Sequence, residues 1–249
     1  MTLKELLEIM AQVAKVKNLN TPYIVGGVPR NIVLGKLDEI KDVDITTGSP
    51  DVETLALGFA DSLGMELKTI GHHKTLNYGG ISFDFSHNFV YPEIDKLFAK
   101  NNLSGMSSMD RETYSRDFTT NTLMLDLSMK TIVDLTGKGY SDTQRKVLDC
   151  PLDCAVSFVH DPKRMLRAFH FKASYGYTFS KALKEALLAH ASLLSTVNSK
   201  YASQITNTIF RNNEAVIDEM IEMGLFKHLP LSKELTEILL RKHKILDVL

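Results

Sequence analysis

Residues 23–44 read YIVGGVPRNIVLGKLDEIKDVD, and this stretch decides the fold of the first half of the chain. The apolar run 23–25 predicts a short buried strand, and the pair Gly26-Gly27 predicts the turn that follows it. Pro29 suits the first turn of a helix, so the pattern predicts a strand, a tight turn and a helix. Glycines here let backbone N–H groups approach phosphate oxygens, and a helix N-terminus adds positive potential.

The stretch ends with two carboxylates, Asp42 and Asp44. Two residues apart on a strand, they project to the same face, where they repel each other unless a cation lies between them. A hard divalent cation such as Mg²⁺ is the natural counter-ion. Asp84 lies in the alternating run 81–85, and as a third carboxylate on a neighbouring strand it would complete a two-metal site. A lone D-x-D is more typical of a solvated strand end, but its position after the glycine pair favours the metal site.

The flanking segments extend this α/β pattern. Apolar residues at helical spacing predict an amphipathic helix over 2–17, and Ser49-Pro50-Asp51 predicts a helix start, with the helix running to about 63. Together these patterns predict an α+β head with a small mixed β-sheet. The remaining strands are expected near 66–70, 75–78, 81–85, 122–127 and 130–134.

Two later regions differ in pattern. Residues 87–113 have weak periodicity and polar clusters, which predict a long mobile loop that orders around substrate. From about residue 155 the pattern is almost wholly helical. We therefore predict a head domain over 1–150 and an all-α region over 151–249.

The composition excludes several classes of protein. With 249 residues, 44% hydrophobic and 24% charged, the chain is not disordered, and it has no apolar run of transmembrane length. Its start does not resemble a secretion signal, and two cysteines are too few for a disulfide framework, so we expect a reducing, cytoplasmic location and no membrane partner. Residues 1–159 hold 16 Lys+Arg and 21 Asp+Glu, against 13 and 9 in 160–249. This asymmetry permits a cation-binding half beside a phosphate-binding half.

Three further segments point to a known family. Residues 115–121 read SRDFTTN and resemble an R-R-D-F-T-x-N motif, 134–137 read DLTG and resemble D-P-x-G, and 160–168 read HDPKRMLRA and resemble E-D-P-x-R-x-L-R-A. Together with the glycine pair and the D-x-D, they make the chain resemble the class II, or bacterial-type, tRNA CCA-adding nucleotidyltransferases and poly(A) polymerases. This family lies in the DNA polymerase β superfamily, and the resemblance runs from about residue 20 to 230. It implies that the head over 1–150 is the catalytic nucleotidyltransferase domain. It also implies that residues 151–249 are a helical neck and partial body, which selects the nucleotide and binds RNA.

The resemblance implies roles for individual residues. Asp42 and Asp44 would hold two Mg²⁺ ions, one activating an RNA 3′-hydroxyl and the other binding the triphosphate, with Asp84 as a third catalytic carboxylate. In-line attack on the α-phosphate would then release pyrophosphate. The nucleotide-binding residues implied by the matched motifs are Gly26, Gly27, Arg30, Arg116, Asp117, Asn121, Asp161, Arg164 and Arg167.

Base selection is expected from Asp161 and Arg164. They lie three apart, and we expect them on one helix face, where the acid accepts from an exocyclic amine and Arg164 donates to ring acceptors. Cytosine and adenine carry that amine, so the resemblance implies use of CTP and ATP and rejection of GTP and UTP. From spacing alone, a plain salt bridge within a helix is the commoner meaning of such a pair.

The chain departs from the family pattern at several positions, among them Ser115 for an Arg, Lys138 for a Gly and His160 for a Glu. None of these changes removes an expected metal ligand. The leading hypothesis is a metal-dependent RNA nucleotidyltransferase that adds C, A or both to a tRNA 3′ end. Two alternatives stay open: a poly(A) polymerase or an enzyme acting on another RNA or small acceptor, and a catalytically degenerate nucleotide-binding module.

Overall fold

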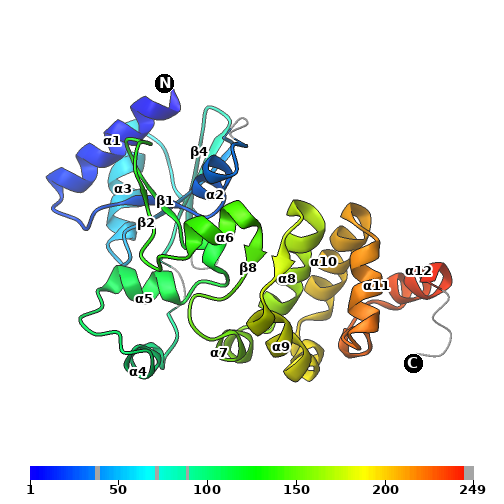
Figure 1. The fold of residues 1–249 in the computed structure, drawn as a ribbon. Coiled ribbons are helices and arrows are strands. Elements are labelled where there is room, and N and C mark those ends of the chain that lie inside the picture. The colour runs from blue at the N-terminus through cyan, green and yellow to red at the C-terminus, as the bar shows by residue number, and fades with distance from the viewer. Residues whose placement is uncertain (37–39, 71–72, 88–89, 244–249) are drawn as a thin grey trace. The chain divides into compact units, whose positions relative to one another are not determined.

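The computed structural model describes residues 1–36, 40–70, 73–87 and 90–243, with side chains as far as Leu239. The chain divides into two compact units, Met1–Arg145 and Lys146–Leu249, which we describe separately (Figure 1).

The first unit is built on a mixed seven-stranded sheet with the order β3-β4-β5-β2-β1-β6-β7. Neighbouring strands are antiparallel except for β2 and β5, which run parallel. The predicted strands are confirmed, and β3, β6 and β7 are shorter than predicted. They are β1 (Tyr23–Val25), β2 (Asp42–Thr46), β3 (Lys68–Ile70), β4 (His73–Tyr78), β5 (Ile81–Phe85), β6 (Met124–Asp126) and β7 (Ile132–Val133).

Two helices, α1 (Leu3–Val16) and α3 (Val52–Leu63), pack together and cover one face of this sheet (Figure 1). Strand alternation aims Val43 and Ile45 of β2 into the core beneath them. Phe59 of α3 meets Phe83 of β5 edge-on, with ring centroids 5.4 Å apart. Because these apolar residues occupy one face, the alternating polar residues of β2 and β5 are left for the other face.

The remaining described helices of the first unit are α2 (Gly27–Val33), α4 (Ile94–Lys100), α5 (Ser108–Tyr114), α6 (Gly139–Arg145) and the 3₁₀ turn η1 (Thr119–Asn121). Among them, α2 packs against strands β1, β2 and β6, and α6 packs against α2 and η1. One correction concerns 87–113, which we expected to be a long irregular loop. Apart from residues 88–89, which lie outside the described residues, this region contains two short helices, and a Ser107–Asp110 capping box starts the second. Each helix is only two turns long, too short for periodicity to reveal.

The second unit is helical, as the periodicity predicts, with α8, α10 and α11 packed side by side (Figure 1). It also holds a short parallel pair of two-residue strands, which the helical pattern did not predict. Its elements are β8 (Val147–Leu148), α7 (Cys154–His160), α8 (Lys163–Tyr175), β9 (Thr178–Phe179), α9 (Lys181–Ala189), η2 (Ala191–Thr196), α10 (Ser199–Asn212), α11 (Ala215–Glu222), η3 (Phe226–His228) and α12 (Lys233–His243).

Neither cysteine has the character of a reactive thiol. Cys150 and Cys154 are both buried and free. Burial raises the pKa of the Cys150 thiol well above its usual range, and the adjacent Cys154 thiol adds to the rise. No helix within the described ranges combines the length and apolar character needed to cross a membrane.

Candidate functional site

The glycine turn and the D-x-D strand meet at one point on the sheet. β1 pairs with β2 so that Val25 lies opposite Asp44, and the chain then turns sharply at Gly26, which has φ 73° and ψ −123°. A Cβ added at Gly26 would lie 2.5 Å from Oδ2 of Asp44, well inside van der Waals contact. Glycine is therefore required twice here, for the backbone conformation and for the close approach of Asp44.

Asp84 lies beside Asp44 on the adjacent strand. The parallel register of β2 and β5 pairs Asp42 with Ser82 and Asp44 with Asp84. The side chains of Asp42 and Asp44 are exposed, whereas Val43 between them is buried. Thr75 of β4 donates a hydrogen bond to Oδ1 of Asp84. The three carboxylates thus occupy one polar face of the sheet, with Asp84 held by its neighbour.

The electrostatics of this face suit a cation. Although Asp44 reaches solvent, partial desolvation raises its pKa, and the nearby Asp84 carboxylate raises it further. The Arg116 guanidinium opposes this rise, so it acts on the same carboxylate. In the described part of the chain, no group of three or more His, Cys, Asp or Glu side chains is placed to hold a metal ion by itself. Mg²⁺, however, commonly binds one or two carboxylates together with substrate phosphates, and Asp42 with Asp44 fits that requirement.

Arg30 connects the glycine turn to the SRDFTTN segment. The side chain of Arg30 on α2 is 8% exposed, and its Nη1 donates to Oδ1 of Asn121 at 2.9 Å. The Asn121 amide in turn donates to Oδ1 of Asp117 at 2.9 Å. Three residues predicted to bind the nucleotide are therefore joined in one buried hydrogen-bonded chain. Asp117 and Asn121 act here first as supports that orient Arg30.

Arg116 belongs to a second buried network, which includes an acid that sequence reasoning missed. Its Nη2 lies 2.7 Å from Oε1 of Glu112, and its Nη1 donates to the Asn121 carbonyl at 3.2 Å. The other Glu112 oxygen accepts from the Thr46 hydroxyl at 2.7 Å. Glu112 lies four residues before Arg116, a spacing typical of an ion pair on a helix. This signal was missed because the weak periodicity of 87–113 predicted a loop there.

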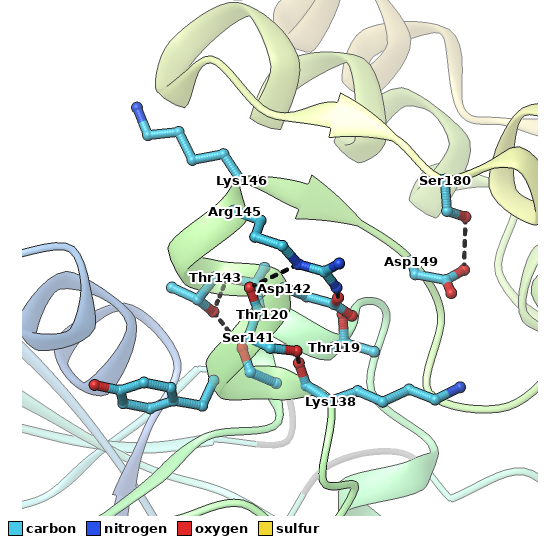
Figure 2. Close-up of polar contacts among 12 residues, drawn as sticks. Thr119, Thr120, Lys138, Ser141, Asp142, Thr143, Arg145, Lys146, Asp149 and Ser180 are labelled. Carbon is cyan, nitrogen blue, oxygen red and sulfur yellow. Dashed lines mark hydrogen bonds and ion pairs between the residues drawn. The ribbon is translucent and has the colours of Figure 1, made fainter.

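Helix α6 holds the threonines of the same segment in place. Figure 2 shows Thr119 donating to Asp142 at 2.9 Å, while Arg145 pairs with the other Asp142 oxygen at 2.8 Å. Thr120 and Thr143 share a hydrogen bond of 2.8 Å (Figure 2). The close packing needs Gly139 at the start of α6, because a Cβ there would lie 2.8 Å from the Thr119 carbonyl oxygen. The segment 115–121 is thus held by α6 through its threonines and by Glu112 of α5 through Arg116.

Ser115 shows how the chain accommodates a departure from the family pattern. Where the R-R-D motif has its first Arg, Ser115 is fully buried, and its hydroxyl accepts from the Tyr91 backbone N–H at 3.2 Å. This bond ties the segment to the chain just before α4.

Asp161 and Arg164 lie close together, but our placement of both on one helix face was wrong. Asp161 is the residue after α7 and has an extended backbone, because Pro162 disfavours the helical conformation in the residue before it. Arg164 lies in the first turn of α8, with its Nε 3.9 Å from Oδ2 of Asp161. Its Nη1 donates to the buried Ser157 hydroxyl at 2.9 Å, so Arg164 is held from two sides.

The predicted site residues therefore fall into two sets. Asp161, Arg164 and Arg167 all belong to the second unit, where Arg167 lies on α8 and is half-buried. The first unit contains the others, on or near its central strands: Gly26, Gly27, Arg30, Asp42, Asp44, Asp84, Arg116, Asp117 and Asn121.

Comparison with known proteins identifies relatives of this arrangement. Residues 22–149 match the poly(A) polymerase head domain. A CCA-adding enzyme of Bacillus pumilus is 27% identical over 212 residues, which cover 84% of this chain and 51% of the relative. An A-adding tRNA nucleotidyltransferase of Aquifex aeolicus is 26% identical over 242 residues, covering 91% of this chain and 24% of the relative.

Solved structures share the fold. A tRNA nucleotidyltransferase complexed with a primer tRNA and an incoming ATP analogue superposes with a TM-score of 0.70 at 24% identity, covering 88% of this chain and 62% of that one. The chain spans about half the length of the first curated relatives it matches.

Proposed function

The chain belongs to the poly(A) polymerase head domain family, and from this premise we propose that it is a metal-dependent RNA nucleotidyltransferase. It adds C, A or both from CTP and ATP to a tRNA 3′ end and releases pyrophosphate, in the cytoplasm. The observation that carries the proposal is the convergence of Asp44, Asp84 and the Gly26 turn at the central strands of the sheet. A phosphate-binding turn beside paired carboxylates suits phosphoryl-group chemistry with Mg²⁺.

Each set of residues has a definite task in this reaction. Asp42 and Asp44 would hold two Mg²⁺ ions, which would supply charge stabilisation and activate the attacking hydroxyl. The Gly26–Gly27 backbone leaves room for the triphosphate. Arg30 and Arg116 offer positive charge beside it, each oriented by buried partners. Because the chemistry is positioning and charge stabilisation, orientation of these groups sets the rate.

The alternatives differ in their products. A poly(A) polymerase would extend an RNA with a long run of A, and the A-adding relative makes adenylate transfer a specific second candidate. A degenerate module would bind nucleotides without transferring them.

The test is transfer of each labelled NTP, supplied separately with Mg²⁺, to tRNA lacking its 3′ end. We expect wild type to incorporate C, A or both, and Asp42→Asn or Asp44→Asn to lower the rate by at least about 100-fold, more than loss of an outer-shell partner usually costs. Both variants should retain the wild-type melting temperature, since each removes like-charge repulsion. Asp61→Asn, at an exposed carboxylate on α3, is the control. Full transfer activity in both site variants is the result that overturns the proposal.

A further inference from the structure

Glu112 is an unusual residue for a short surface helix. Its side chain is 1% exposed, although carboxylates are seldom fully buried unless they are paired. Both of its oxygens are in use: Oε1 lies 2.7 Å from Nη2 of Arg116, and Oε2 accepts from Thr46 at 2.7 Å. Removing Arg116 would take away the opposite charge, and removing Thr46 would take away the donor to Oε2, so each change disturbs a buried carboxylate.

The two partners of Glu112 belong to different parts of the candidate site. Thr46 is the last residue of β2, two positions beyond Asp44, and its hydroxyl also accepts from the Gly48 N–H at 3.0 Å. Arg116 opens the R-D segment. The Glu112 carboxylate therefore bridges strand β2, which carries Asp42 and Asp44, and the segment 115–121, which carries the Arg116 guanidinium.

The bridge leaves the Arg116 guanidinium little freedom. Two of its nitrogens have fixed partners, Glu112 and the Asn121 carbonyl, and only 8% of the side chain is exposed. Its charge acts on Asp44 from this fixed position. An Arg held in this way presents its remaining donors in one direction, whereas an untethered Arg would sample many rotamers.

We propose that Glu112 is a positioning residue, which orients Arg116 against β2 so that the guanidinium meets the triphosphate bound beside Asp44. This inference rests on the proposed function, because it assigns Glu112 a task in that nucleotidyl transfer. Glu112 acts through Arg116 and does not touch substrate.

The experiment is a double-mutant cycle on steady-state transfer with the NTP concentration varied. Glu112→Gln keeps the shape and one accepting oxygen, but it removes the negative charge that pairs with Arg116 and replaces the second acceptor with a donor. We expect kcat/KM to fall about 10- to 100-fold, the usual cost of losing an outer-shell partner. In an Arg116→Ala background the same change should cost less than about 2-fold, because the residue through which Glu112 acts is gone. Equal losses in the two backgrounds would overturn the proposal.

Two further variants separate positioning from simple support of α5. Thr46→Val cuts the link between Glu112 and β2, together with the bond from the Gly48 N–H, and leaves the Glu112–Arg116 pair in place. We expect a fall of about 2- to 10-fold in kcat/KM, as for loss of one hydrogen bond to Glu112. This variant also serves if Glu112→Gln fails to fold. Asp110→Asn weakens the capping box of α5 without touching Arg116, and it should lower the melting temperature while leaving kcat/KM within about 2-fold. If Asp110→Asn reproduces the kinetic loss, Glu112 acts only by holding the helix.

Failure of the proposed function can be distinguished from failure of the Glu112 proposal. If wild type transfers no nucleotide to any RNA, that function is wrong, and equilibrium binding of CTP and ATP with Mg²⁺ then tests Glu112 alone. A reduced affinity in Glu112→Gln, absent in the Arg116→Ala background, would support the bridge, and an unchanged affinity would overturn it.

Discussion

At the scale of single residues, the lack of a side chain at Gly26 allows the backbone after β1 to lie against the Asp44 carboxylate. Its φ of 73° with ψ −123° is a conformation that side chains rarely adopt, and its missing Cβ makes room for the Asp44 carboxylate. A side chain at this position would therefore both strain the backbone and clash with Asp44, a proposed metal ligand.

Replacing this residue should separate the two effects. We expect Gly26→Ala to lower transfer by more than about 10-fold, because displacing Asp44 by a fraction of an ångström spoils the alignment of the metals. Gly79→Ala is the matched control, since Gly79 also has a positive φ but nothing lies within 4 Å of an added Cβ. The control should lose about 1–2 kcal/mol of stability and keep its activity. Equal activities of the two variants, measured beside thermal unfolding, would contradict this account.

At the scale of elements, the connection from β2 to α3 is organised by Asp51. The hydroxyls of Thr47 and Ser49 donate to one of its oxygens, and the Asn20 N–H donates to the other at 2.8 Å. Asp51 thus ties the segment before β1 to the start of α3. Partial desolvation alone would raise the Asp51 pKa, but these hydrogen bonds outweigh it and lower the pKa below its usual value.

This lowered pKa predicts a pH dependence of stability. A carboxyl whose folded-state pKa is depressed contributes stability that is complete above its unfolded-state pKa and lost as the pH falls through the folded value. We expect Asp51→Asn to be less stable than wild type at pH 7, and the difference to shrink below roughly pH 5. Urea unfolding of both proteins from pH 7 to about pH 3 measures it. A difference that stays constant over this range, or one that Asp61→Asn reproduces, would refute the role of Asp51.

At the scale of the whole molecule, the residues expected to bind metal and those expected to select the base lie in different compact units. The first unit contains Asp42, Asp44 and Asp84, and the second contains Asp161 and Arg164. Because Ser157 and Asp161 both engage Arg164, its guanidinium is held before any nucleotide arrives. We predict that the two tasks can be altered separately.

Asp161→Ala should therefore relax base choice without changing the need for Mg²⁺. An acid that accepts from the amine of C or A faces a carbonyl oxygen in U or G, so its removal lifts a penalty against the wrong bases. We expect incorporation of UTP and GTP relative to CTP and ATP to rise at least about 10-fold, with the Mg²⁺ titration unchanged. Glu185→Ala, which breaks an exposed ion pair on α9, is the control. Unchanged discrimination in a competition assay with all four NTPs would rule out this role for Asp161.

Sequence alone determined the local features of this protein. The apolar runs and glycine turns predicted the strands, and 3.6-residue spacing predicted α1 and the helical second half, because both signals arise within a few neighbouring residues. The D-x-D spacing placed Asp42 and Asp44 on one face for the same reason. The sequence did not predict the short helices α4 and α5, because two turns carry too little periodicity. It also placed Asp161 in a helix, whereas Pro162 keeps Asp161 in an extended conformation.

Only the tertiary structure decided which distant residues meet. The parallel register of β2 with β5 sets Asp84 beside Asp44, although 39 residues separate them in the chain. Burial of Glu112 between Thr46 and Arg116 likewise depends on how α5 packs against the end of β2. Strand partners and buried polar pairs depend on the free energy of the whole folded unit. The free-energy costs of loop closure and desolvation are offset only by contacts between residues far apart in sequence.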